Sequence, residues 1–327
     1  MEPLMTRKEA KALLNLKHKS VEREVDQLKI EKADDRHRLA FLYASANRYN
    51  IMPYCSASDD ATFFRKVVFH ERMALEERKL LTQLAPLIEL KGLEHIERFD
   101  KRGIVFCSFH VGSFFSPLYL FASQGIDVTA CIASNAYTQL KTTIENDIKK
   151  LSKNGFNQGR IKLLDMGTPR ASFQMVRILK EGGNLLLYVD VASGDEDKKK
   201  ETTTIVNMLS GKLKVKKGGA RIAYLTKRPI IPLISQYNNN GVISLRAYRP
   251  ILPPKLGNEQ NFCKRAMETL FSLLEKRLYN KPDEWEGWLY CHNMVIPKSG
   301  LESDNTKGIV ELPQYMVNRE RFVCYNA

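Results

Sequence analysis

From Gly103 onward, short apolar runs alternate with helix-like stretches, and this alternation restricts the fold more than any other feature of the chain. The first apolar runs are IVFCSF, IDVTACIA, RIKLLDM and NLLLYVD, and SFFSPLYLFASQG, residues 137–152 and TPRASFQMVRILKEGG lie between them. Strands and helices that alternate at this spacing predict βαβ units and a largely parallel sheet. The runs TTTIVNML, PIIPLISQY and GVISLRAY extend it, and the Asn238–Gly241 turn predicts a hairpin between the last two.

Residues 1–98 have a different pattern. In KEAKALLNLKHKSVEREVDQLKIEK and FFRKVVFHERMALEERKLLTQLAPLIEL, apolar residues recur three and four positions apart, which predicts helices throughout. A further long helix is predicted over 258–280. We therefore expect an α/β fold with a largely parallel or mixed central sheet flanked by helices. Its parts are a helical region at 1–98, an α/β domain at 99–300 and an irregular tail at 301–327.

Positive charge is concentrated in one part of the chain. The 327 residues include 51 Lys and Arg against 37 Asp and Glu, a net charge of +14. Such charge attracts an acidic protein, an anionic lipid surface, a nucleotide-containing cofactor or a nucleic acid. For any single lysine a solvated surface is the better explanation, so the basic segment from Lys212 to Arg228 indicates only the sign of a partner's charge. The basic residues between Lys212 and Arg228 are Lys212, Lys214, Lys216, Lys217, Arg221, Lys227 and Arg228, with no acidic residue among them.

The sequence also indicates a compartment. The N-terminus MEPLMTRKEAKALL has no apolar core of a signal peptide, and the six cysteines lack close CxxC spacing, which favours reduced thiols. The uncharged stretch from Ile104 to Ile126 is long enough to cross a bilayer. However, its serines, glycines and proline are more typical of a strand, a turn and a buried helix. We expect a cytoplasmic protein.

The sequence FHVGSF at 109–114 has the strongest indication of chemistry. His110 falls where a predicted buried strand turns into a helix, at the sheet edge where open α/β proteins bind ligands. Gly112 allows a close turn, and Ser113 is placed to cap the helix, whose N–H groups suit a developing oxyanion. An imidazole there can take a proton from an attacking hydroxyl or amine. A structural histidine explains the local sequence equally well.

Four segments between Gly103 and Asn293 resemble the late lipid A biosynthesis acyltransferases, in that family's order and spacing. GIVFCSFHVGSFFSPLYLFASQGIDVTA resembles the strand that ends in the family's His-Phe-Gly-Asn-Trp-Glu motif. LKEGGNLLLYVDVASG is similar to the apolar strand before an Asp-Gln pair. VNMLSGKLKVKKGGARIAYLTKRPIIPLI resembles the glycine-containing third block, and KPDEWEGWLYCHN the Trp-containing ending. The resemblance implies a glycerolipid-acyltransferase-like fold.

The resemblance assigns roles to individual residues. His110 matches the catalytic histidine, Gly112 the glycine two positions later, and Asp190 the aspartate of the Asp-Gln pair. The other matching positions are Gly211, Gly218, Pro282, Glu284, Trp285 and Trp288.

The chain also departs from the family's pattern. Phe115 occupies the position of the acid that follows the histidine, and Asn146-Asp147 lie where the family has an arginine. The family's N-terminal membrane anchor has no counterpart, which predicts a soluble member. We expect Asp190 to support His110 instead, because Asp190 ends a neighbouring strand; Asp195 or Glu196 could do so from the following loop. An amine acceptor, which needs less activation, and a loss of catalysis are the remaining explanations.

The resemblance implies an acyltransferase that uses an acyl-carrier-protein or coenzyme A thioester as donor, with no bound cofactor or metal. The acceptor is a glycolipid, a peptide or another intermediate of lipid or natural-product biosynthesis. An acidic carrier would dock on Lys212, Lys214, Lys216, Lys217 and Arg221, and the same charge suits peripheral contact with the inner membrane. A non-catalytic acyl- or carrier-binding protein is the alternative, favoured by Phe115, and a nucleic-acid-binding protein is an outsider based on charge alone.

Two further patterns have simpler explanations. Cys107 lies inside an apolar run, where a buried, inert thiol is expected and a Cys–His nucleophile is not. Cys291-His292 lacks the additional ligands of a metal site.

Overall fold

The computed structural model describes residues 5–30, 35–52, 57–99, 101–155, 159–191, 202–238, 240–296, 309–312 and 315–318. The chain divides into two compact units, each assembled from three segments. Unit 1 consists of Met1–His18, Met73–Val189 and Lys217–Ala266, and unit 2 of Lys19–Arg72, Asp190–Lys216 and Met267–Ala327. The helices α1 (Arg7–Asp26), α3 (Asp60–Lys79) and α9 (Glu259–Leu278) contribute residues to both.

Unit 1 contains a mixed, mostly parallel sheet, as predicted. Its order is β1-β9-β8-β2-β5-β3-β4. The strands from β8 to β4 are parallel to one another, β9 is antiparallel to β8, and β1 is parallel to β9. The bounds are β1 Ile88–Lys91, β2 Val105–Ser108, β3 Val128–Ile132, β4 Ile161–Asp165, β5 Asn184–Tyr188, β8 Ile230–Tyr237 and β9 Ile243–Ala247.

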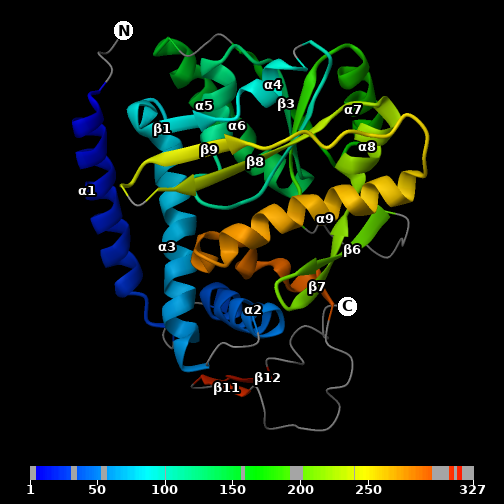
Figure 1. Ribbon diagram of the computed structural model, residues 1–327. Coiled ribbons are helices and arrows are strands. Elements are labelled where there is room, and N and C mark those ends of the chain that lie inside the picture. The colour runs from blue at the N-terminus through cyan, green and yellow to red at the C-terminus, as the bar shows by residue number, and fades with distance from the viewer. Residues whose placement is uncertain are drawn as a thin grey trace. The chain divides into compact units, whose positions relative to one another are not determined.

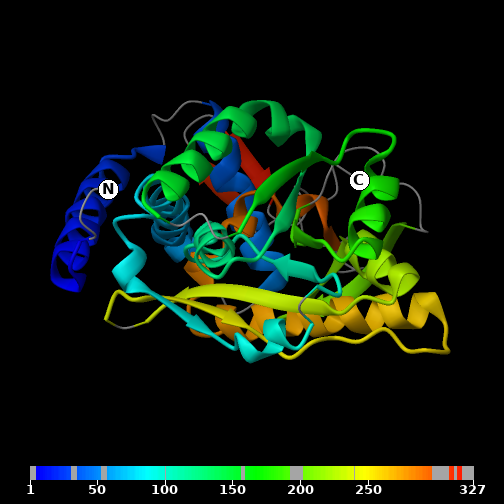
Figure 2. The ribbon, with the colours of Figure 1, turned by 90° about the horizontal axis from the view of Figure 1, so that it is seen from above.

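Helices cover both faces of this sheet. Near β3, α5 (Ser116–Ser123) and α6 (Ser134–Lys153) lie to one side, and α7 (Ala171–Lys180) and α8 (Gly218–Thr226) to the other (Figures 1 and 2). The short helix α4 (Glu94–Glu97) precedes β2. Because β2 and β5 are covered on both faces, their sequences are almost continuously apolar.

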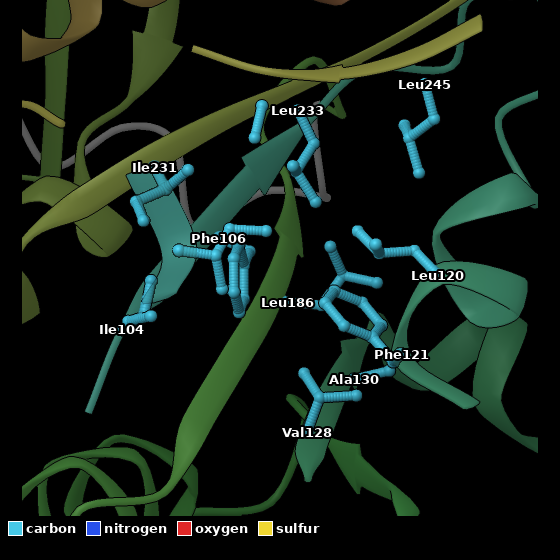
Figure 3. Packing of buried hydrophobic residues seen from close by; sticks show 12 residues of the cluster. Ile104, Phe106, Leu120, Phe121, Val128, Ala130, Leu186, Ile231, Leu233 and Leu245 are labelled. Carbon is cyan, nitrogen blue, oxygen red and sulfur yellow. The ribbon is translucent and has the colours of Figure 1, made fainter. Parts of the chain in front are cut away.

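The main core of unit 1 lies between the sheet and α5. Phe106 of β2 packs against Phe121 of α5, with ring centroids 5.0 Å apart. Apolar side chains from four further strands complete this layer (Figure 3). The surrounding buried members are Ile104, Leu120, Val128, Ala130, Leu186, Ile231, Leu233 and Leu245. This packing fixes β2, whose carboxyl end leads to His110.

Unit 2 combines α2 (Asp35–Ile51) with a small antiparallel sheet of order β10-β7-β6. The strands are β6 Thr203–Met208, β7 Gly211–Lys216 and β10 Val295–Ile296, and short 3₁₀ turns span Pro282–Glu284, Glu286–Leu289 and Cys291–Asn293. Trp285 and Trp288 are fully buried, and the Asn47 side chain donates to the Trp288 carbonyl at 2.8 Å. In unit 2 both tryptophans therefore belong to the core.

The structure differs from the sequence-based expectations in several elements. β1 lies in the region predicted to be helical throughout, because it pairs with β9, far along the chain. β7 and α8 were not predicted from the basic segment, and β11 (Ile309–Leu312) and β12 (Tyr315–Asn318) form a hairpin in the tail expected to be irregular. Among the described residues, no helix is both long and apolar enough to cross a bilayer.

Candidate active site

His110 stands just beyond the carboxyl end of β2, between the neighbouring strands β5 and β8. Its chain neighbours Phe109 and Val111 are fully buried, whereas His110 is partly exposed. Buried flanking residues fix the backbone, so the position of the imidazole is set by the sheet. This is the edge at which parallel α/β sheets bind ligands.

Two aromatic side chains pack against the imidazole. The Tyr188 ring, at the end of β5, lies 4.5 Å from the His110 ring centroid, and the Phe114 ring lies 4.9 Å away. The Tyr188 hydroxyl donates a hydrogen bond to the Phe114 carbonyl. Tyr188 therefore connects β5 to the turn that holds His110. No short sequence pattern points to Tyr188 as a residue of this site.

Gly112 allows the turn after His110 to approach β8. Its φ is +56°, a conformation that favours glycine, and a Cβ there would lie 3.0 Å from the Ser235 carbonyl oxygen. Four residues on, the Ser116 hydroxyl donates to Ser235 Oγ at 3.2 Å. The predicted close turn is thus present, and it fastens the His110 segment to the carboxyl end of β8.

Ser113 does not cap the following helix, contrary to expectation. Helix α5 begins at Ser116, its N-cap position is Phe115, and it has no side-chain cap. Ser113 is buried, and its hydroxyl has no hydrogen-bond partner within the described part of the chain. The chain makes an extra bend between Gly112 and the helix, which moves Ser113 away from the capping position.

Phe115, which occupies the motif-acid position, lies beside a buried ion pair. The Arg78 guanidinium lies 5.1 Å from the Phe115 ring centroid. Arg78 Nε is 3.2 Å from Asp147 Oδ2, and both side chains are more than nine-tenths buried. Burial raises the pKa of the Asp147 carboxyl, and Arg78 opposes that rise. Beside Phe115, an ion pair therefore joins Arg78 of α3 to Asp147 of α6.

An acid from α3 reaches the carboxyl end of β8. Glu77 is 1% exposed, and the Tyr237 hydroxyl lies 2.9 and 2.8 Å from its two carboxylate oxygens. Tyr237 is the last residue of β8, two positions after Ser235. No sequence pattern points to Glu77, because it lies within an ordinary charged helical pattern and contacts Tyr237 from 160 positions away.

Asp190, the expected support for His110, belongs to unit 2. It is completely buried, and Trp285 Nε1 donates to its Oδ2 at 2.8 Å. Its charge contributes, after burial, to a raised pKa for Tyr290 in the same unit. The role predicted for Asp190 stays a prediction. Asp195 and Glu196 lie outside the described residues.

The expected docking residues differ in exposure. Lys212 is exposed and Lys214 and Lys216 are partly exposed on β7, where they alternate with the buried Leu213 and Val215. By contrast, Lys217 is only 8% exposed, and the Arg221 guanidinium is 3.1 Å from Glu259. These last two residues belong to unit 1.

Cys107 has the properties of a buried thiol. Burial raises the pKa of Cys107 to about 12, so its thiol is protonated and unreactive at neutral pH. His292 stacks on Tyr43 with ring centroids 3.6 Å apart. Across the described part of the chain, no three His, Cys, Asp or Glu side chains gather to hold a metal ion.

The fold and the site define a class: an α/β protein with a histidine at the carboxyl edge of a mostly parallel sheet, suited to proton transfer. The family model for the bacterial lipid A biosynthesis acyltransferases matches residues 69–292, well over half of the chain. The chain belongs to this family, and its class of activity is acyl transfer. No curated protein matches the sequence.

Proposed function

We propose that the protein transfers an acyl chain from a thioester to a hydroxyl or amine, with His110 as the general base. The position of His110 is the observation that supports this most directly. The imidazole is partly exposed at the carboxyl edge of the sheet, and Tyr188 and Phe114 pack against it. A base held in one orientation loses little conformational freedom during the reaction.

The reaction needs one proton transfer in each direction. His110 accepts the proton of the acceptor hydroxyl or amine as that group attacks the thioester carbonyl carbon. A bond from the acceptor oxygen or nitrogen to this carbon forms, and the carbon–sulfur bond then breaks. The imidazolium returns its proton to the leaving thiolate. A carboxylate near the imidazolium would stabilise it, and Asp190 is the residue that the sequence suggests, because it follows a neighbouring strand.

We propose an acyl carrier protein as the donor, with coenzyme A as the second choice. Carrier proteins of this kind are acidic, and the β6–β7 hairpin offers a positively charged face. Lys212, Lys214 and Lys216 alternate along β7, opposite Asn207, Ile205 and Thr203 of β6. Because Lys217 is buried and Arg221 pairs with Glu259, we assign docking mainly to the three β7 lysines. Coenzyme A phosphates would also be attracted to them.

The acceptor that we propose is a glycolipid or another intermediate of lipid or natural-product biosynthesis. Basic residues favour association with an anionic surface, so the reaction could take place at the cytoplasmic face of the inner membrane.

The direct test is His110→Gln assayed with acyl carrier protein thioesters and candidate acceptors. The loss of a general base lowers the transfer rate by about 10²- to 10⁴-fold. Binding of the acyl donor should be unchanged. His95→Gln is the matched control, because His95 is a partly exposed histidine of α4 in the same unit. Full transfer by His110→Gln would refute the proposed mechanism.

A non-catalytic acyl- or carrier-binding protein is the second candidate, and Phe115 at the motif-acid position is the observation that favours it. In that case, wild-type protein would bind the acyl carrier without transferring or hydrolysing the acyl chain. Measurement of both binding and turnover separates the two functions.

A further inference from the structure

We propose that Glu77 is the positioning carboxylate of His110, in place of the acid that Phe115 has replaced. This inference rests on the proposed function, in which His110 takes up a proton. Glu77 is on α3, far from the motif in the sequence, and it belongs to the same unit as His110.

The carboxyl end of β8 connects Glu77 to the His110 turn. Gly112 approaches this strand so closely that a Cβ would lie 3.0 Å from the Ser235 carbonyl oxygen and 3.4 Å from the Gln236 Cα. The next residue, Tyr237, holds both carboxylate oxygens of Glu77. Ser235 and Gln236 of β8 therefore lie close to the His110 turn, and the next residue, Tyr237, contacts the acid.

His110 and this contact lie at the same edge of the sheet. Cys107 of β2 is aligned with Pro232 of β8 in a parallel pair, and β2 ends one residue later at Ser108. The carboxyl ends of the two strands therefore lie at one edge, from which β8 continues to Tyr237. Glu77 is thus attached to the edge of the sheet that carries the His110 turn.

A negative charge on the Glu77 carboxylate would act strongly on neighbouring groups, because the side chain is buried. The carboxylate is almost fully buried, and the Tyr237 hydroxyl lies within hydrogen-bond reach of both of its oxygens. Charges interact more strongly in a buried setting than in water. A negative charge at this edge stabilises an imidazolium and so raises the basicity of His110.

Beside the turn, the described charged side chains Arg78 and Asp147 are engaged with one another. Arg78, next to Glu77 on α3, pairs with Asp147 of α6 and covers the Phe115 ring. Tyr188 of β5 donates to the Phe114 carbonyl. The ion pair between Arg78 and Asp147 is internally compensated, so Asp147 is a weaker source of negative potential for the imidazole than Glu77.

The experiment is an NMR titration of ¹³C-labelled histidine in the full-length protein, with the His110 signal assigned from His110→Gln. Glu77→Gln keeps the size of the side chain and an oxygen that accepts from Tyr237, but removes the charge. We expect the His110 titration midpoint to move to lower pH by about one unit, a tenfold loss in proton affinity. The acidic limb of the kcat/KM profile should move in the same direction, and kcat should fall by about 10- to 100-fold. Glu77→Asp, which keeps the charge, should restore part of both.

A purely structural role would lower thermal stability without moving the His110 midpoint, and the inference would then be wrong. It would also be wrong if Asp190→Asn moved the midpoint and Glu77→Gln did not. If Glu77→Gln does not fold, Tyr237→Phe should move the midpoint in the same direction by a smaller amount, and an unmoved midpoint would refute the link. A shifted midpoint in a protein without transfer activity would refute the proposed function and leave the role of Glu77 supported.

Discussion

His292 makes the stability of the protein depend on pH. Burial lowers the pKa of His292 from 6.5 to about 4, because the charged ring is poorly solvated in the folded chain. Below pH 6.5 the unfolded chain takes up a proton that the folded chain does not bind. The free energy of unfolding therefore falls as the pH drops from 6.5 toward 4, by less than ~1.4 kcal/mol per pH unit because the ring is partly exposed.

His292→Phe isolates this contribution, since phenylalanine can keep the stacking on Tyr43 and does not titrate. The buried His292 Nδ1 has no hydrogen-bond partner among the described residues, so the replacement breaks no bond at that atom. Urea unfolding at pH 7, 5.5 and 4.5 should show a smaller loss of stability in the variant than in wild type. Equal losses would show that another group is responsible.

Among the individual residues of the site, the sequence predicted only those that lie close together in the chain. His110 and Gly112 were found because a strand, a histidine and a glycine follow one another within a few positions. Tyr188 and Arg78 contact the turn, and Glu77 contacts Tyr237, across tens of positions in the sequence. No short pattern encodes such contacts. The capping role expected for Ser113 was wrong because the bend before α5 could not be foreseen.

Among the elements, the turn between β2 and α5 depends on glycine. In Gly112→Ala, the left-handed conformation and the 3.0 Å approach to the Ser235 oxygen would strain the backbone by ~1–3 kcal/mol. We expect lower stability, measured by urea unfolding, and slower transfer because His110 is displaced.

Gly218→Ala provides the matched control for this turn. A Cβ at Gly218 would meet nothing within 4 Å, and the residue opens α8. Its stability should be unchanged or higher by up to ~1 kcal/mol. A destabilised Gly218→Ala together with an unaffected Gly112→Ala would contradict this account of the turn.

The sequence predicted most of the large elements, since strong apolar periodicity is a local property. β1 was missed because its four residues continue a helical pattern and become a strand only by pairing with β9. β7 was missed for a different reason: its lysines drew attention to charge, although Leu213 and Val215 alternate with them as in a half-buried strand. A half-buried strand with lysines on its exposed face therefore has the same composition as a basic surface segment.

For the whole molecule, the net charge of +14 predicts salt-sensitive association with an acidic carrier protein. The association rate should fall by roughly tenfold or more between low and high salt. In a variant with Lys212→Glu, Lys214→Glu and Lys216→Glu, association should be slower and much less sensitive to salt. Stopped-flow fluorescence with a labelled carrier measures both.

The control variant changes Lys8, Lys11 and Lys19 of α1 to glutamate. Each replacement lowers the charge by two, so three lower it by six in either variant, from +14 to +8. If the β7 lysines form the docking site, only their replacement slows association strongly. Equal effects would assign the attraction to overall charge.

The division of each unit into three separate stretches of chain has a consequence for engineering this protein. Neither unit corresponds to one continuous piece of gene. To be produced alone, each would need new connections between its three stretches.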